Sequence, residues 1–212
     1  MIVKKDWDIF FDDEVKGLTK LNLPDPETLD YYERIKNREI FWNFDIDDSL
    51  VDFSLMIIKW NKQDKGKTSD ERIPIKILIN SNGGDLPAVL NFINVLQLSK
   101  TPVYTIGLGK TYSSAGLMLL AGSKGHRYVF QDTTALIHSG STGAMGNTDK
   151  VLDNFEFTQR QEKRVKDFIV ANTNITDKLY TKNYRKDWWL TSDEIISLGL
   201  ADKIITDLDE IF

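Results

Sequence analysis

The chain has 212 residues, of which 41% are hydrophobic and 28% charged, and it contains 13 Gly and 5 Pro. This composition is typical of a globular domain with a substantial core, and it excludes a fibrous or largely disordered chain. The formal net charge of −5 argues against a general nucleic-acid binder, since such proteins normally carry a basic face.

The sequence contains no cysteine, which excludes disulfides, thiol nucleophiles and zinc sites built on thiolates. Residues 1–17 carry scattered charges and no apolar core of signal-peptide length. The longest apolar stretch, residues 115–121, is far shorter than the roughly 20 residues that span a bilayer. We therefore expect a soluble protein of the cytoplasm.

Residues 1–27 mix aromatic, acidic and lysine side chains without a clear period and end in Leu-Pro-Asp-Pro. We interpret them as an N-terminal arm in front of a single domain, residues 28–212. At the start of that domain, residues 28–37 favour a short helix with Thr28 or Asp30 as its N-cap.

A strand is expected at residues 38–44, followed by a helix at residues 48–60. The apolar residues of this helix recur on roughly one face. They are Leu50, Val51, Leu55 and Ile58. Residues 61–72 are charged and contain Gly, and we interpret them as a solvated linker.

From residue 73 onwards, short apolar and β-branched runs alternate with segments of helical period. The expected strands are residues 73–79, 102–108, 128–130 and 135–138, the first of them with both faces covered. The expected helices are residues 86–98, 115–121 and 148–171. Alternation of this kind predicts an α/β fold with right-handed crossovers and a largely parallel sheet.

Polar clusters follow the expected strands. A turn that contains Gly83 and Gly84 follows the first strand, and a turn at residues 109–114 that ends in two serines follows the second. His138 ends the strand at residues 135–138. Because functional groups of parallel sheets gather at the carboxyl ends of the strands, we expect these clusters to form the functional site.

The sequence has two histidines. His126 lies in a charged turn, Lys124-Gly125-His126-Arg127, and we expect it to be a solvated surface residue. His138 stands between a buried strand and a Gly-containing segment. That position suits a catalytic base as well as a structural histidine.

Ser113 and Ser114 lie where a helix begins. A serine in this place is often only an N-cap, but a nucleophile there gains nearby amides that can stabilise an oxyanion. Gly83 and Gly84 fit a plain β-turn, or a pair of unhindered backbone donors. The phosphate-loop patterns GxGxxG and GxxxxGK[ST] are absent, and two histidines without HExxH give little support for a catalytic metal.

Together these residues resemble the proteolytic subunit family of the ATP-dependent Clp protease, over roughly residues 31–205. The I-N-S-P-G-G turn of the family matches residues 79–84, and its nucleophile segment G-x-A-A-S-M-G-A matches residues 109–116. The further matches are A-G-A-K-G-x-R at residues 121–127, M-I-H-Q-P at 136–140, D-x-F-x-S-A at 187–192 and Y-G-L-x-D at 198–202. The block from residue 83 to residue 202 aligns with the family pattern without a gap.

The resemblance implies the Clp protease/crotonase-like fold, α/β with repeated β-α-β units and a protruding handle at about residues 134–172. It also implies a serine endopeptidase without a cofactor or metal. The implied triad is Ser113 as nucleophile, His138 as base and Asp187 as the acid that orients it. The implied oxyanion hole is formed by Gly84 and Ser114, and the implied substrate contacts are Gly83, Ser139 and Gly140.

As partners, the resemblance implies peptide or unfolded-protein substrates, a homo-oligomeric ring (a heptamer or tetradecamer) and an AAA+ unfoldase. No nucleic-acid or membrane partner is expected. Several departures mark a divergent member. Thr111 and Tyr112 replace two small residues before the nucleophile, Ser139 and Gly140 replace Gln-Pro, and the arm does not resemble the family's axial loop.

Two other functions stay open at this point. The first is a catalytically inactive subunit that serves only to build the ring. The second is an acyl-CoA enzyme of the related crotonase type, which normally places carboxylates near its oxyanion hole.

Overall fold

The computed structural model describes residues 25–141, 143 and 145–211. The predicted N-terminal arm, residues 1–27, lies outside the described residues except for its last three.

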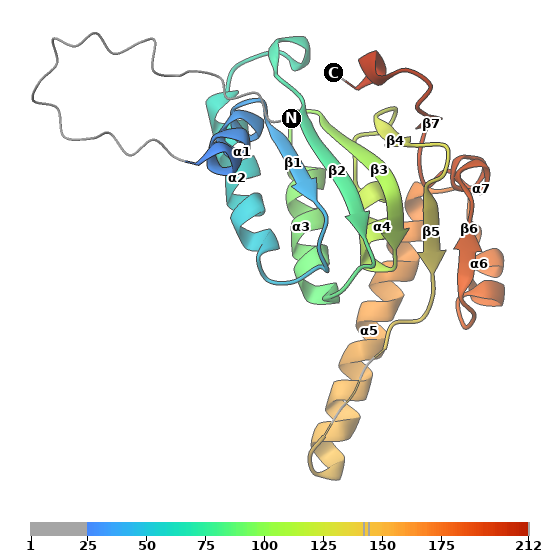
Figure 1. The fold of residues 1–212 in the computed structure, drawn as a ribbon. Coiled ribbons are helices and arrows are strands. Elements are labelled where there is room, and N and C mark those ends of the chain that lie inside the picture. The colour runs from blue at the N-terminus through green and yellow to red at the C-terminus, as the bar shows by residue number, and fades with distance from the viewer. Residues whose placement is uncertain (1–24, 142, 144, 212) are drawn as a thin grey trace, which may run out of the picture.

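The described residues form one α/β unit (Figure 1). Its strands are β1 (Glu39–Trp42), β2 (Ile75–Ser81), β3 (Val103–Tyr112), β4 (Arg127–Val129), β5 (Thr134–Ile137), β6 (Trp188–Leu190) and β7 (Lys203–Ile204). Its helices are α1 (Pro26–Lys36), α2 (Leu50–Gln63), α3 (Leu86–Leu98), α4 (Ser114–Leu120), α5 (Thr148–Asn172), α6 (Asp177–Asn183) and α7 (Ser192–Ser197), with short 3₁₀ turns at Ser69–Glu71 and Leu208–Glu210.

The sheet is parallel except at one edge. Strands β1, β2, β3, β4 and β7 are hydrogen-bonded in that order, and every pair runs parallel. Strand β5 pairs in parallel with β3, and β6 pairs antiparallel with β5. The largely parallel sheet is therefore confirmed. Strands β6 and β7 escaped prediction because three and two residues are too few to show a period.

Strand β3 is longer than predicted. It reaches Tyr112, so the turn expected at residues 109–114 is wrong in its first four residues. Residues 105–107 pair with β4, and residues 110–112 pair with β5. The side-chain oxygen of Asn80 accepts a hydrogen bond of 3.0 Å from the amide of Lys110, which supports the extension. The end of β3 is thereby placed beside the end of β5.

The main hydrophobic core lies between the sheet and helices α2, α3 and α4 (Figure 1). The side chains of β2 alternate between fully and half buried, so only one face of this strand is completely covered, not both as predicted. A second cluster lies on the opposite face of β3 and β4, where the C-terminal segment covers it. Its buried members are Ile106, Tyr128, Ile205 and Ile211.

Helix α1 begins earlier than predicted. The carboxylate of Asp25 accepts a hydrogen bond of 2.9 Å from the amide of Thr28, so Asp25 is the N-cap. Pro26 takes the first helical position, where its missing N–H costs nothing. The two predicted caps, Thr28 and Asp30, lie inside the helix.

Helix α2 buries a different face from the predicted one. Leu50 is buried together with Ile57 and Trp60. The other three predicted core residues are half exposed and form a stripe, which we call the α2 stripe: Val51 (54% exposed), Leu55 (60%) and Ile58 (52%). Both sets recur at helical spacing, so periodicity alone could not select the buried one.

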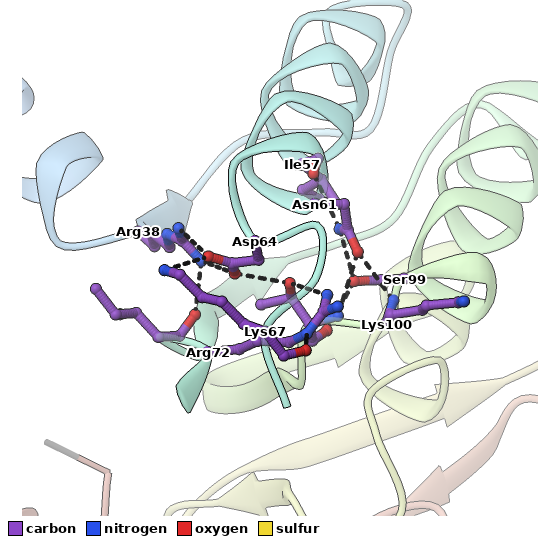
Figure 2. Close-up of polar contacts among 10 residues, drawn as sticks. Arg38, Ile57, Asn61, Asp64, Lys67, Arg72, Ser99 and Lys100 are labelled. Atoms are coloured by element: carbon purple, nitrogen blue, oxygen red, sulfur yellow. Dashed lines mark hydrogen bonds and ion pairs between the residues drawn. The ribbon is translucent and has the colours of Figure 1, made fainter. Parts of the chain in front are cut away.

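Residues 61–72 are not the solvated linker that their charges suggest. Asp64 is fully buried, and its carboxylate accepts hydrogen bonds of 2.5 and 3.0 Å from Arg38 (Figure 2). Thr101 and Lys67 donate two more, of 2.9 and 3.1 Å. The hydrogen bonds from Arg38 hold the pKa of Asp64 well below its usual value. This network joins the ends of α1, α2 and α3 to the start of the sheet.

Helix α5 extends away from the rest of the fold (Figure 1). It has 25 residues, and Ile169 near its C-terminal end is its one buried residue. Leu152 and Phe155, near the other end, are 55% and 56% exposed. The predicted helix at residues 148–171 is therefore present, in the position expected of the protruding handle.

Candidate active site

The predicted polar clusters lie at neighbouring strand ends. Gly83 and Gly84 follow β2, Ser113 follows β3, and His138 follows β5. Because β3 pairs in parallel with both β2 and β5, these ends meet at one edge of the sheet. Asp187 directly precedes β6, which runs antiparallel to β5, so it starts where β5 ends.

Ser113 forms a sharp turn between β3 and α4. Its φ of 53° and ψ of −124° lie in a region that non-glycine residues rarely adopt, at a cost of about 1–3 kcal/mol. Its amide donates a hydrogen bond of 2.8 Å to the carbonyl of Leu136, which holds the turn against β5. Ser113 is the N-cap of α4, yet its side chain makes no capping bond, and its hydroxyl has no hydrogen-bond partner among the described residues. A strained serine with an uncommitted hydroxyl between strand and helix is typical of a nucleophile turn.

His138 and Asp187 face each other across the β5–β6 ladder. The ladder pairs Ile137 with Trp188, so the next register position sets His138 opposite Asp187. The imidazole Nδ1 lies 3.7 Å from the carboxylate Oδ1, which is longer than a hydrogen bond. Within the described part of the chain, no hydrogen bond joins His138 to Ser113 either. The structure thus brings the three predicted residues to one edge without closing the contacts between them.

The two glycines are required by close packing. Both have positive φ, +95° at Gly83 and +149° at Gly84. A β-carbon on Gly83 would lie 2.6 Å from the carbonyl oxygen of Tyr112 and 2.9 Å from the Cβ of Ser113. A β-carbon on Gly84 would overlap the backbone of Ile46. The Gly-Gly turn therefore packs directly on the serine turn, and a side chain at either position would separate them.

Ile46 has a role in the site that the sequence did not reveal. It forms a parallel bridge with Gly84, in which its amide donates to Gly83 (2.8 Å) and its carbonyl accepts from Asp85 (2.7 Å). This pairing leaves the amide of Gly84 without an acceptor among the described residues, and the same holds for the amide of Ser114. A single apolar residue in an acidic segment gives no signal for such a contact.

The predicted substrate contacts after the histidine lie on an exposed segment. The amide of Ser139 donates a hydrogen bond of 2.9 Å to the carbonyl of Tyr184, which ties this segment to the loop that leads to Asp187. Gly140 has open space around its Cα. Residues 142 and 144 of the same loop lie outside the described residues. Substrate binding by Gly83, Ser139 and Gly140 stays a prediction.

Tyr112, which replaces a small residue beside the nucleophile, packs toward β5 and β6. Its hydroxyl lies 2.9 Å from Oγ1 of Thr134, and its ring meets Trp189 edge-on, with centroids 5.0 Å apart at 88°. Trp188 packs against the main core, whereas Trp189 is 53% exposed. The tryptophan pair therefore divides its contacts between the core and Tyr112.

His126 is not the free surface residue that its charged turn suggests. Its ring stacks on Tyr104 with centroids 4.1 Å apart, and its Nδ1 lies 3.2 Å from the hydroxyl of Tyr128. The neighbouring turn is held by Asp202, which pairs with Arg127. Burial alone would raise the pKa of Asp202, but hydrogen bonds from Arg127 outweigh it and lower that pKa.

Two further features of the described residues concern metal ions and membranes. No group of three His, Cys, Asp or Glu side chains there could hold a metal ion. None of the helices within the same residues has the length and apolar character needed to cross a membrane.

The fold and the site define an α/β protein that gathers a serine, a histidine and an aspartate at one edge of a parallel sheet. The model of the Clp protease family matches residues 25–207, and the chain therefore belongs to the Clp protease family. It is 31% identical, over 138 residues, to the ATP-dependent Clp protease proteolytic subunit 2 of Treponema denticola. The aligned residues cover 65% of this chain and 69% of that protein. It is 32% identical, over 143 residues, to the protein of the same name from Bifidobacterium longum, with 67% and 69% covered. The resemblance and the Clp protease-like fold class are thus confirmed.

Proposed function

We propose that this chain is a serine endopeptidase, the proteolytic subunit of a Clp-type ring protease. The observation that carries the proposal is the state of Ser113, which combines a strained backbone with an uncommitted hydroxyl. Two amides that find no acceptor among the described residues lie in the adjoining turns, and a histidine and a carboxylate lie at the neighbouring strand ends. Membership of a protease family supports the same chemistry.

In the proposed reaction, Oγ of Ser113 attacks the scissile carbonyl carbon while His138 takes the hydroxyl proton. The amides of Gly84 and Ser114 stabilise the oxyanion of the tetrahedral intermediate. When the intermediate collapses, the C–N bond breaks, and His138 gives its proton to the leaving amine. Water then attacks the acyl ester with His138 as base, which releases the new carboxylate and restores Ser113. Asp187 orients the imidazole and stabilises its protonated form.

The reaction needs a small adjustment of the base and the acid. The 3.7 Å between His138 and Asp187 must shorten to hydrogen-bond length. The side chain of Asp187 is 67% exposed, against 27% for His138, so rotation of the carboxylate can close this gap while the backbone of β6 stays in place. Catalytic contacts that tighten only around substrate are common.

We further propose that the subunit assembles into a homo-oligomeric ring. The related proteins of Treponema denticola and Bifidobacterium longum are each named as a subunit of an ATP-dependent protease. Large apolar side chains are left exposed on the α2 stripe and on the protruding half of α5, and closed symmetric assembly is the usual way to cover such surfaces. An AAA+ unfoldase that delivers unfolded chains is the corresponding partner.

The proposal is tested by labelling the purified protein with a fluorophosphonate probe, which reacts with activated serines. We expect labelling of the wild type, none of Ser113→Ala, and labelling of Ser114→Ala. The two serines are adjacent, so Ser114→Ala tests which of the two hydroxyls reacts; it should still be labelled, although more slowly, because it loses the hydrogen bond from Ser114 to Gly84. Full labelling of Ser113→Ala would refute the assignment of the nucleophile.

One observation favours a second candidate, the inactive structural subunit. The contacts among Ser113, His138 and Asp187 are open, as expected of a site that no longer acts. Hydrolysis of fluorescently labelled casein separates the two functions, since turnover that depends on Ser113 excludes the structural one. The acyl-CoA enzyme has no comparable support. Asp85, the carboxylate next to Gly84, is already engaged as the N-cap of α3, with a 2.7 Å hydrogen bond from Ala88.

A further inference from the structure

An aromatic contact connects the strand that carries the nucleophile to the strand that carries the acid. Tyr112 is the last residue of β3, directly before Ser113, and Trp189 lies in β6, two residues after Asp187. The register sets Tyr112 opposite Leu136 of β5, and Leu136 opposite Trp189. The two rings meet above this middle residue, edge to face at 5.0 Å.

Asp187 depends on β6 for its position. Apart from the 3.7 Å approach to His138, it makes no hydrogen bond or ion pair with another described residue. Strand β6 has three residues and pairs with β5 alone in the described sheet. A single ladder leaves an edge strand free to twist about its neighbour, and such a twist would swing Asp187 relative to His138. A contact that reaches the next strand along, β3, opposes it.

Tyr112 is itself held in place. Its hydroxyl shares a 2.9 Å hydrogen bond with Oγ1 of Thr134, which lies on β5 two residues before Leu136. The ring therefore lies across β5 with both of its ends fixed, one by the backbone of β3 and the other by Thr134. Trp189 is 53% exposed and does not belong to the main core, and its ring contact with Tyr112 ties it to β3.

We propose that Tyr112 and Trp189 are positioning residues that act as one unit: their contact holds β6 so that Asp187 stays in line with His138 and Ser113. The inference rests on the proposed peptidase function and adds two residues to it, neither of which touches the reacting atoms. It gives the bulky side chain at position 112 a role in the site.

The test compares Tyr112→Ala, Trp189→Ala and the double variant in the full-length protein. We expect each single substitution to lower kcat for casein hydrolysis by about tenfold to a hundredfold with KM unchanged, the effect of displacing catalytic groups by about 1 Å or less. The double variant should lose no more kcat than the less active of the two single variants, because both substitutions remove the same contact. Tyr112→Phe and Trp189→Phe keep an aromatic pair and should retain most of the activity.

Tyr31→Ala is a matched control. Tyr31 is an exposed aromatic residue with an edge-to-face partner, Tyr32, at 6.0 Å, and it lies on α1, away from β5 and β6 (Figure 1). Its removal should leave kcat at the wild-type level. Thermal unfolding identifies any variant that loses activity because it no longer folds. If Tyr112→Ala is unstable, Trp189→Ala still tests the proposal, because it replaces a half-exposed side chain.

A spectroscopic measurement separates positioning from general stability. In ¹⁵N-histidine-labelled protein that carries the phosphonyl group on Ser113, the Nδ1 proton of His138 is protected from exchange when Asp187 accepts it. His126→Gln assigns the signals of the two histidines. We expect to observe the signal of the His138 Nδ1 proton in the wild type and in Tyr31→Ala. In Tyr112→Ala and Trp189→Ala this signal should disappear, because the proton exchanges with water.

The outcomes distinguish the two levels of the proposal. A wild type that is labelled at Ser113, with alanine variants that match its kcat and keep the His138 proton, would overturn the positioning role and leave the peptidase function intact. A wild type that neither reacts with the probe nor hydrolyses casein would overturn the peptidase function, and the positioning role with it.

Discussion

The hydroxyl of Ser114 donates a hydrogen bond of 3.2 Å to the carbonyl oxygen of Gly84. This bond joins the turn after β2 to the turn after β3, and the amides of the same two residues have no acceptor in the described part of the chain. Ser114 is only 3% exposed, so the bond is protected from water. The proposed oxyanion hole is therefore a backbone structure that a buried serine side chain helps to hold.

Replacement of Gly84 by alanine should remove one oxyanion donor. The new β-carbon would overlap the backbone of Ile46, so the turn must move and take its amide with it. Loss of one such donor lowers kcat by about 10²–10³-fold, and we expect a loss in this range for casein hydrolysis by Gly84→Ala. Gly66→Ala is the control, because Gly66 has a similarly positive φ of +93° but open space around it. Equal activity of the two variants would contradict the role of Gly84.

Replacement of Asp187 by asparagine should remove the charge that stabilises protonated His138 while its shape is kept. In a working triad this change costs about 10⁴-fold in kcat. We expect a loss approaching that size, measured by the rate of fluorophosphonate labelling and by casein hydrolysis. Asp193→Asn, an exposed carboxylate in the first turn of α7, should change neither rate. An Asp187→Asn variant that reacts as fast as the wild type would exclude Asp187 as the acid.

Asp64 should make stability depend on pH in acid. Its folded-state pKa is lowered by hydrogen bonds from Arg38, so its contribution is fully present above the ordinary pKa of about 3.9 and is lost as the pH falls through the lower folded value. Asp64→Asn leaves Arg38 buried without its charge partner and should cost about 3–5 kcal/mol at pH 7. The difference in unfolding free energy between wild type and variant should shrink as the pH is lowered below about 4.

Urea unfolding at a fixed protein concentration measures this difference. Asp70→Asn is a suitable control, because Asp70 is exposed on the same segment and lies outside the network around Asp64. Its substitution should change the unfolding free energy by less than about 1 kcal/mol. A difference between wild type and Asp64→Asn that stays constant from pH 7 to pH 3 would show that the buried ion pair does not have the proposed energetic role.

The α2 stripe should be covered in the assembled ring. Leu55 is at its centre and is 60% exposed, so a glutamate there would bury a charge at the interface between subunits. We expect Leu55→Glu to sediment as a smaller species than the wild type in analytical ultracentrifugation. Leu98→Glu makes the same substitution at a leucine that is 82% exposed at the end of α3, outside the stripe, and should assemble normally. Full-size rings of Leu55→Glu would place the subunit interface elsewhere.

The parts of the site that could be predicted are those whose residues mark strand ends. Gly83, Ser113 and His138 each follow an apolar run, and parallel pairing brings such ends together whatever the details of the loops. The helix predicted at residues 86–98 has those bounds in the structure. Long periodic segments report their structure locally, which is why these predictions succeeded.

The parts that could not be predicted depend on contacts between distant residues. Arg38 and Asp64 pair across 26 positions, so the charged segment around Asp64 resembled a linker. Helix α2 is apolar on two faces, and only the tertiary fold decides that Ile57 points inward while Leu55 does not. Ile46 supports Gly84 through its backbone, for which a side-chain pattern carries no information. The cytoplasmic location and the size of the ring stay predictions.

The central claim is that the proposed oxyanion amides and the triad of Ser113, His138 and Asp187 act together on the carbonyl of a bound substrate. A crystal structure of the protein after reaction with the fluorophosphonate would test this claim most directly. We predict a phosphorus–oxygen bond to Ser113 and a phosphonyl oxygen about 2.7–3.1 Å from the amides of Gly84 and Ser114. His138 should then lie within hydrogen-bond distance of Asp187, closer than the present 3.7 Å. A phosphonyl group on another residue, or one on Ser113 whose oxygen turns away from both amides, would contradict the account.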